Sequence, residues 1–193
     1  VVSPDGEKLL AWGPVFKDVK GQFSALLQID RKSGATTTLL PGTDFACKWA
    51  GWLDGKAVVT GTDFKKYGVN ENVKFFFVEN GETACITPEL DKGLRNSVGS
   101  DCRYGSTDLN LAFFTDGPAA WFVSTDNYRS HLHAVTASGA MEQITKELFS
   151  VDDWRVSGGK AAVVGMKGLQ LQELYLVDRE REIQLTHFND WLL

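Results

Sequence analysis

QELYLVDREREIQLTHFNDWLL, residues Gln172 to Leu193, is the stretch that decides the fold of this chain. Residues 173–178 alternate in type with a period of two, which is typical of a β-strand with two different faces. The polar run at 178–182 cannot be buried cheaply and predicts a turn, after which residues 183–186 supply a second strand. Weaker copies of this unit occur three more times upstream.

Three markers recur in the same order in these copies. The first is a turn pair ending in Gly, which supplies the positive φ angles that a two-residue hairpin turn demands. It occurs as Asp5-Gly6, Asp54-Gly55, Asp116-Gly117 and Gly158-Gly159. The second is an apolar strand that runs into a polar turn, at 26–34, 75–81, 132–139 and 174–182. The third is a pair at the end of a strand, as Ile86-Thr87, Ile144-Thr145 and Leu185-Thr186, with Leu39-Leu40 as a degenerate first copy.

These markers return after about 40 to 50 residues, with one longer copy. Each complete copy holds four predicted strands, which in the last copy are 152–156, 161–166, 173–178 and 183–187. Four-stranded units at this period are typical of β-propeller blades, and no helical periodicity competes with them. We therefore predict an all-β chain that forms a β-propeller fragment of about four four-stranded blades, with a β-sandwich as the alternative.

The predicted blades have boundaries that follow from the markers. They span residues 1–42, 43–90, 108–148 and 149–189, with a long inter-blade loop at 91–107 and the start of a linker at 190–193. The first blade is incomplete, because only Val1, Val2, Ser3 and Pro4 precede its first turn. A blade without its first strand has an open edge, which proteins normally avoid, so we expect the chain to begin inside a larger propeller.

Composition and charge limit the classes of partner. The chain has 193 residues, a formal net charge of −5 and interspersed charge signs, so no basic stripe is available for nucleic acid. No apolar run approaches the roughly 20 residues of a membrane span, and no signal peptide opens the sequence. We expect a cytoplasmic location with neither nucleic acid nor membrane as a partner.

Cysteine usage agrees with a reducing compartment. Cys47, Cys85 and Cys102 are odd in number and widely spaced, with no CxxC pair. Such a set suits neither a disulfide framework nor a zinc site, and we predict buried free thiols.

Several stretches of the sequence resemble stretches in a known family of proteins. Ser3-Pro4-Asp5-Gly6 before an apolar strand resembles the propeller repeats of the prolyl oligopeptidase family. Residues 114–117, 121–124 and 130–133 resemble the last-but-one blade of acylaminoacyl-peptidase-like members. Glu173-Leu174-Tyr175 followed by residues 184–189 (QLTHFN) resembles the blade that precedes their catalytic domain. The resemblance covers essentially the whole chain.

The resemblance implies a parent serine peptidase in which the propeller restricts access to a following α/β-hydrolase domain that carries a Ser-Asp-His triad. That hydrolase domain would be the main partner, and peptides would be the substrates of the parent. The present chain contains no G-x-S-x-G elbow, and the nearest approach, GSTDL at Gly105, lacks the second Gly. No catalytic, cofactor-binding or metal-binding residue is therefore assigned, and no cofactor is expected.

Histidines and acidic pairs are the candidate residues for chemistry in this sequence. His131 and His133 lie two apart on a predicted strand and share a face, so they could bind a metal, but we expect two exposed or half-buried polar positions. His187 could be taken for the base of a catalytic triad, but it lies at the end of a repeat strand and no nucleophile is available for it to activate. The acidic pairs could serve as paired carboxylates or as recognition groups for a peptide amino terminus, but we expect solvated turns, since adjacent strand residues point to opposite faces. These pairs are Asp152-Asp153 and Glu180/Glu182.

Five tryptophans are expected to pack between blades, because large rings bury much apolar area, with an aromatic ligand platform as the alternative. They are Trp12, Trp49, Trp52, Trp121 and Trp154.

Two other functions stay open beside the peptidase propeller. One is a non-enzymatic propeller that binds proteins or envelope components, and the weaker one is a metal-dependent propeller lyase. An open fragment would expose apolar inter-blade faces, so we also predict self-association.

Overall fold

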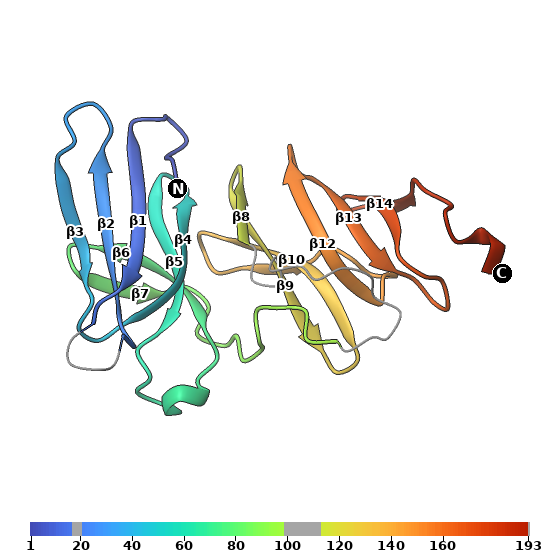
Figure 1. Cartoon of the computed structure of the whole chain (residues 1–193), viewed down its shortest axis with the longest axis horizontal. Coiled ribbons are helices and arrows are strands. Elements are labelled where there is room, and N and C mark those ends of the chain that lie inside the picture. Colours follow the sequence, from blue (N-terminus) through green and yellow to red (C-terminus); the bar gives the residue numbers. More distant parts are fainter. Residues whose placement is uncertain (17–20, 99–112, 193) are drawn as a thin grey trace. The chain divides into compact units, whose positions relative to one another are not determined.

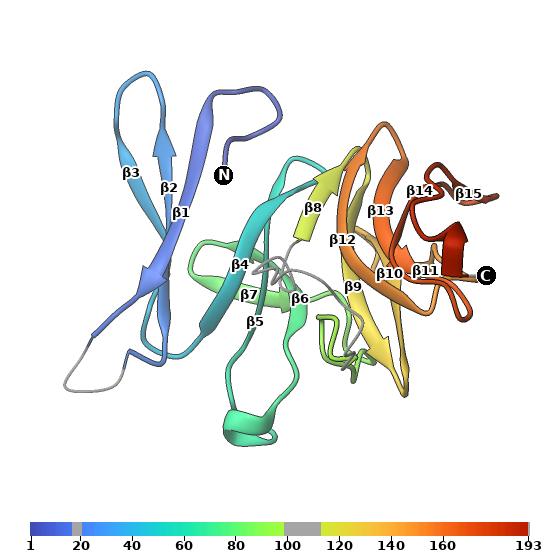
Figure 2. The same cartoon turned by 45° about the vertical axis from the view of Figure 1, so that its right-hand side comes forward.

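The computed structural model describes residues 1–16, 21–98 and 113–192, and its strands form four antiparallel sheets. The chain divides into two compact units. Unit 1 holds residues 1–91 together with 137–139, and unit 2 holds residues 92–136 and 140–193. Figures 1 and 2 show the two sheets of each unit.

Unit 1 contains a three-stranded and a four-stranded sheet, each a meander in chain order. The first sheet consists of β1 (Lys8–Pro14), β2 (Ser24–Asp30) and β3 (Thr36–Pro41). The second consists of β4 (Ala46–Leu53), β5 (Lys56–Thr62), β6 (Lys74–Glu79) and β7 (Glu82–Cys85). A short 3₁₀ helix, η1 (Gly68–Asn70), lies between β5 and β6.

Unit 2 contains two four-stranded meanders that lie face to face in both views (Figures 1 and 2). The first consists of β8 (Phe113–Asp116), β9 (Ala119–Asp126), β10 (Arg129–Thr136) and β11 (Met141–Gln143). The second consists of β12 (Ser150–Ser157), β13 (Lys160–Met166), β14 (Glu173–Val177) and β15 (Glu182–Gln184), followed by the 3₁₀ helix η3 (Asp190–Leu192).

The four sheets confirm the all-β prediction and its four-strand units. Their strands fall inside the ranges 1–42, 43–90, 108–148 and 149–189. The inter-blade loop predicted at 91–107 lies partly outside the described residues.

Residues 1–3 occupy the place of a fourth strand in the first sheet. Val2 forms an isolated antiparallel bridge with Leu9, and the N–H of Leu10 donates to the carbonyl of Val1 at 2.8 Å. These bonds lie on the edge of β1 opposite β2, where each of the other sheets has its first strand. The sheet is thus incomplete among the described residues, in agreement with the predicted incomplete first blade.

The Gly-containing turns follow the expected chemistry with two exceptions. Asp54 and Gly55 have φ of 51° and 73°, and the Gly158-Gly159 pair also has both φ angles positive, as a two-residue hairpin turn requires. At the other two sites only Gly6 and Gly117 adopt positive φ. The two-residue turn expected at Asp116-Gly117 is shifted by one residue, because Asp116 still pairs with Ala119 in the ladder.

Each unit has one apolar core between its two sheets. In unit 1, Leu10, Leu26 and Leu40 pack in the same cluster as Trp52 and Val59 of the second sheet. In unit 2, both sheets contribute to a cluster of thirteen buried residues that includes Trp121, Trp154 and Tyr175. Sheet-on-sheet packing of alternate side chains therefore holds each unit together.

Two of the five tryptophans differ from the expected packing. Trp52, Trp121 and Trp154 lie in the cores, and Trp154 meets Phe114 edge-on at 4.8 Å between ring centroids. Trp12, in contrast, is 37% exposed at the end of β1, and Trp49 is half-buried beside a bulge in β4. The bulge shifts the register after Cys47, so the alternation expected of a regular strand does not hold there.

Candidate functional site

The two β10 histidines face the side of their sheet away from the apolar core. His133 stacks on Phe122 with the ring centroids 5.4 Å apart, and His131 stands edge-on to His133 at 6.4 Å. His131 is buried, contrary to the expected exposed or half-buried position, and its Nδ1 has no hydrogen-bond partner. Within the described ranges no group of three His, Cys, Asp or Glu side chains could hold a metal ion.

Both imidazoles are shifted toward the neutral form. Burial, reinforced by His131 and Lys92, lowers the pKa of His133 to about 4. Burial and the guanidinium of Arg129 lower the pKa of His131 as well. A ring that is neutral at physiological pH and stacked on Phe122 acts as an aromatic packing group, so these positions behave as part of the fold.

Asp152 and Asp153 lie within β12, so the solvated turn expected there is wrong. A bulge at Asp152 shifts the register between Val151 and Asp153, and Asp152 is buried. Its carboxylate accepts hydrogen bonds from Asn96 at 3.0 Å, from Gln172 at 2.6 Å and from the hydroxyl of Ser150. The side chain thereby ties the 92–98 segment to the last sheet instead of forming a paired carboxylate.

Glu180 and Glu182 do not converge either. The carboxylate of Glu182 accepts the backbone N–H groups of Lys146, Glu147 (3.1 Å) and Leu148 (3.2 Å), so it joins the end of one sheet to the start of the next. Only Glu180 matches the expected solvated turn residue. The signal missed in the sequence is that a Glu two residues from a turn can cap free N–H groups elsewhere in the unit.

Glu173 connects the two parts of the stretch that decides the fold. Its buried carboxylate accepts a hydrogen bond from the hydroxyl of Thr186 and two from Asn189, from the backbone N–H at 2.8 Å and from Nδ2 at 3.0 Å. Burial raises the pKa of Glu173, but these hydrogen bonds outweigh it and leave the pKa below its ordinary value. The ELY and QLTHFN segments are therefore joined through this side chain.

His187 follows β15 and remains exposed. Its Nδ1 lies 3.1 Å from a carboxylate oxygen of Asp190, and both side chains are more than half exposed. No serine or cysteine hydroxyl or thiol is recorded in contact with it among the described residues, and GSTDL at Gly105 lies outside them.

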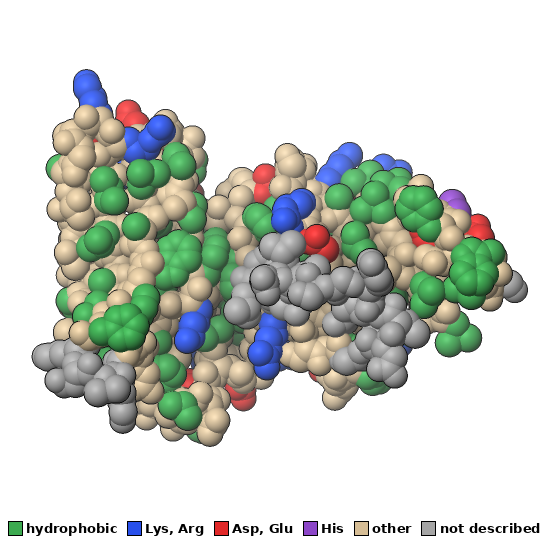
Figure 3. Space-filling view, in the orientation of Figure 1, with side chains coloured by type: hydrophobic (Ala, Val, Ile, Leu, Met, Phe, Trp, Pro, Cys, Tyr) green, Lys and Arg blue, Asp and Glu red, His purple; other side chains and the backbone are tan. Residues whose placement is uncertain are grey.

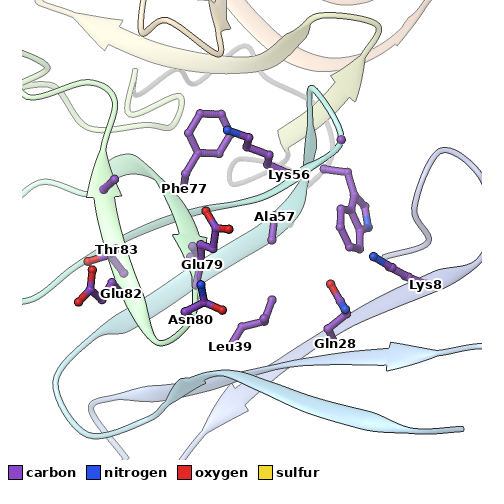
Figure 4. A pocket seen from close by; sticks show the side chains of 14 residues that line it. Lys8, Gln28, Leu39, Lys56, Ala57, Phe77, Glu79, Asn80, Glu82 and Thr83 are labelled. Atoms are coloured by element: carbon purple, nitrogen blue, oxygen red, sulfur yellow. The ribbon is translucent and has the colours of Figure 1, made fainter.

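A groove of about 530 Å³ opens between the two sheets of unit 1, at the end where the β4–β5 and β6–β7 hairpins turn. Figure 4 shows Glu79, Asn80 and Glu82 along one side, with Lys8 and Gln28 on the opposite side. The groove borders the apolar core, because Trp52, Ala57 and Val78 belong to both. It brings together polar groups from β1, β2, β6 and β7 that are far apart in the sequence.

The floor of the groove is apolar. Trp52, Ala57 and Val78 are buried there, and Leu39 is half-buried. Of these residues the sequence pointed only to Trp52, among the packing tryptophans; the others are ordinary strand positions within their own repeats. A site built from two adjacent units has no local sequence motif.

Cysteine positions differ in part from the expected buried thiols. Cys47 is buried, and burial raises the pKa of its thiol to about 12, whereas Cys85 at the end of β7 is exposed. Cys102 lies outside the described residues. Neither described cysteine forms a disulfide.

Three solved structures resemble this chain over nearly its whole length. The acylaminoacyl peptidase of Pyrococcus horikoshii matches 97% of the chain with a TM-score of 0.69 at 18% identity. The β-propeller domain of the Trilobed protease from Pyrococcus furiosus matches 96% with a TM-score of 0.67 at 20% identity. TolB from Acinetobacter baumannii matches 95% with a TM-score of 0.57 at 16% identity. The fold is that of a β-propeller.

This propeller fragment of four blades corresponds to only part of each neighbour. It spans 27% of the P. horikoshii peptidase, 51% of the Trilobed protease propeller domain and 41% of TolB. No protein-family model matches the sequence, and no curated protein matches it. The likeness thus lies in the fold, at identities where activity does not transfer.

Proposed function

We propose that this chain is part of the β-propeller domain of a serine peptidase of the prolyl oligopeptidase family, and that the propeller restricts access of substrates to a following α/β-hydrolase domain. The observation that carries the proposal is the fit of 97% of the chain to the acylaminoacyl peptidase of P. horikoshii. The link from Glu173 to Thr186 and Asn189 supports it, because these residues belong to the segments that resemble the blade preceding the hydrolase domain.

The proposal assigns no catalytic residue to the described residues. Hydrolysis would need a strained strand-to-helix elbow that exposes a serine, with a base and an oxyanion hole around it. The propeller would act by sterics, admitting short peptides and excluding protein-sized chains. Its substrates would therefore be acylated or free oligopeptides.

The coding sequence that contains these residues provides the test. We expect a G-x-S-x-G elbow downstream of Leu193, and we expect the complete gene product to hydrolyse N-acetyl-alanine p-nitroanilide but not casein. The chain of 193 residues alone should hydrolyse neither. A complete product without the elbow, or one that cleaves casein as fast as the small substrate, would refute the proposal.

A second candidate function is a non-enzymatic propeller that binds proteins or envelope components. TolB shares the fold over 95% of the chain, and its name does not mark it as a peptidase, so the fold by itself is compatible with this function. A signal peptide upstream of Val1, together with a gene that lacks the elbow, would support this function over the first.

For the peptidase we propose a cytoplasmic location. The free thiols of Cys47 and Cys85 support a reducing compartment. None of the helices in residues 1–16, 21–98 and 113–192 has the length and apolar character that crossing a bilayer requires. Fractionation of the source cells, followed by detection of the chain, tests the location.

A further inference from the structure

Neighbouring sheets pack on one another in the same sense in both units. In unit 2 the earlier sheet contributes Leu132, Ala134 and Ile144 to the core, and the later sheet contributes Tyr175 and Val177. We call the side of a sheet that packs on the next sheet its forward face, and the side that packs on the preceding sheet its backward face. Unit 1 follows the same order, with apolar residues on both faces.

The forward face of the last sheet is apolar and open to solvent. Leu185 donates its backbone N–H to the carbonyl of Leu174 in this sheet. Ile144 makes the same bond to Leu132 in the preceding sheet, so Leu185 and Ile144 hold equivalent places in their blades. Ile144 belongs to the core and is 1% exposed, whereas Leu185 is 50% exposed. The forward face of the last sheet comprises Leu174, Leu176, Ile183 and Leu185.

The backward face of the first sheet is apolar as well. Asp30 and Asp178 each accept the backbone N–H groups two and three residues further along the chain, so the two turns are equivalent. Ile29 therefore corresponds to Val177, which is fully buried in the core of unit 2, but Ile29 is only half-buried. On β1 and β2 this face comprises Leu9, Ala11, Gly13, Ala25, Leu27 and Ile29, none of which is charged.

The two faces can cover one another without burying an unpaired charge. On the last sheet, Asp153 and Arg155 of β12 lie on the forward side, and they form an ion pair with each other at 3.0 Å. Contact between the faces removes apolar surface from water, which is favourable in proportion to the area. In both units a forward face packs on a backward face, so this combination of faces already occurs twice within the chain.

We propose that the forward face of the last sheet binds the backward face of the first sheet of a second copy of this chain. Leu174, Leu176 and Leu185 of one copy then cover Leu27 and Ile29 of the other. Two different surfaces meet in this contact, so copies associate head to tail. The inference does not rest on the peptidase proposal, and in the parent proposed above further blades of the same polypeptide would compete for these two faces.

Two substitutions, one on each face, test the proposal by sedimentation velocity. Leu185→Lys places a charge on the forward face, and Ala11→Lys places one on the backward face. Both positions are exposed, so both variants should fold, which circular dichroism checks. Each variant alone should associate about tenfold or more weakly than the wild-type chain. Thr37→Lys, at an exposed position on the other face of the first sheet, is the matched control and should associate as the wild type does.

A mixture of the two variants decides which faces meet. The Ala11→Lys chain retains its forward face, and the Leu185→Lys chain retains its backward face. At a concentration where neither variant associates alone, an equimolar mixture should therefore give a dimer with one chain of each kind. Association of either variant alone as strong as that of the wild type would show that like faces or strand edges pair instead. That result, a mixture that stays monomeric, or a monomeric wild-type chain would each overturn the proposal. All these measurements use the chain alone, so their failure leaves the peptidase proposal standing.

Discussion

The side-chain hydroxyl of Thr145 accepts the backbone N–H of Leu132 at 2.9 Å, in the place where a backbone carbonyl would continue the β10–β11 ladder. The same bond recurs from Phe75 to Thr87 at 3.0 Å and from Leu174 to Thr186 at 2.8 Å. In these three blades the residue before the Thr also donates its backbone N–H to the third strand. These bonds join Ile86 to Phe75, Ile144 to Leu132 and Leu185 to Leu174. At the repeated Ile/Leu-Thr pair, a Thr hydroxyl therefore replaces the backbone acceptor, and the regular ladder of the blade's last strand ends there.

Replacement of Thr145 by Val should destabilise the chain by about 1–3 kcal/mol. The side chains have nearly the same shape, but Val leaves the buried N–H of Leu132 without an acceptor. Urea unfolding followed by tryptophan fluorescence gives the free energy of unfolding. Thr37→Val, at an exposed position of β3, is the control and should change this free energy little. Equal effects of the two substitutions would contradict the role of the hydroxyl.

Most of the fold could be predicted because each blade carries its sequence markers within its own repeat. Alternation, Gly turns and the Thr pair lie within one repeat, so they locate strands such as β13 and β14 to within a residue or two. The fourth strands were predicted to run through Thr87, Thr145 and Thr186 but end earlier. The cause is the replacement of a backbone acceptor by a hydroxyl, which interrupts the ladder.

The candidate groove could not be predicted, because its parts are ordinary in isolation. Asn80 looks like a turn residue, and Lys8 and Gln28 look like ordinary strand residues. Only the packing of the β1–β3 sheet on the β4–β7 sheet brings them to one cavity. Asp152 shows the converse: a bulge buries a carboxylate that strict alternation places in a solvated turn.

Glu173→Gln should lower the free energy of unfolding by about 1–2 kcal/mol at neutral pH, because hydrogen bonds to a charged carboxylate are stronger than those to an amide. The pKa of Glu173 is below its ordinary value of 4.5, so its stabilising effect is complete above that value and disappears as the pH falls through the lowered pKa. The difference between wild type and variant should therefore shrink in acid. Urea unfolding across this pH range measures it, and a difference that grows in acid would contradict the role of the charge.

His133 should make the chain less stable in mildly acidic solution. Its pKa is about 4 in the fold against 6.5 ordinarily, so in this interval only the unfolded chain takes up the proton. Its contribution is fully present above about pH 6.5 and falls by at most about 3 kcal/mol as the pH drops to about 4. His133→Phe keeps the stacking on Phe122 and should flatten this dependence. His187→Phe, at an exposed position, should retain the wild-type slope in a pH series of thermal unfolding.

The outward face of the β12–β15 sheet should cause the isolated chain to self-associate. Tyr175 and Val177 of β14 point into the core, so Leu174 and Leu176 face outward beside Ile183 and Leu185. Figure 3 shows hydrophobic side chains gathered over β13, β14 and the segment that runs to the C-terminus.

The exposed fraction is 37% for Ile183 and 50% for Leu185, and among the described residues β15 pairs only with β14, so both an apolar face and a free edge are available. Light scattering should give a mass above 21.3 kDa that rises with concentration. Leu185→Lys should raise the dissociation constant about tenfold or more, because it places a charge in the contact. Thr37→Lys in β3 should not change it. A concentration-independent monomer would show that this face stays solvated.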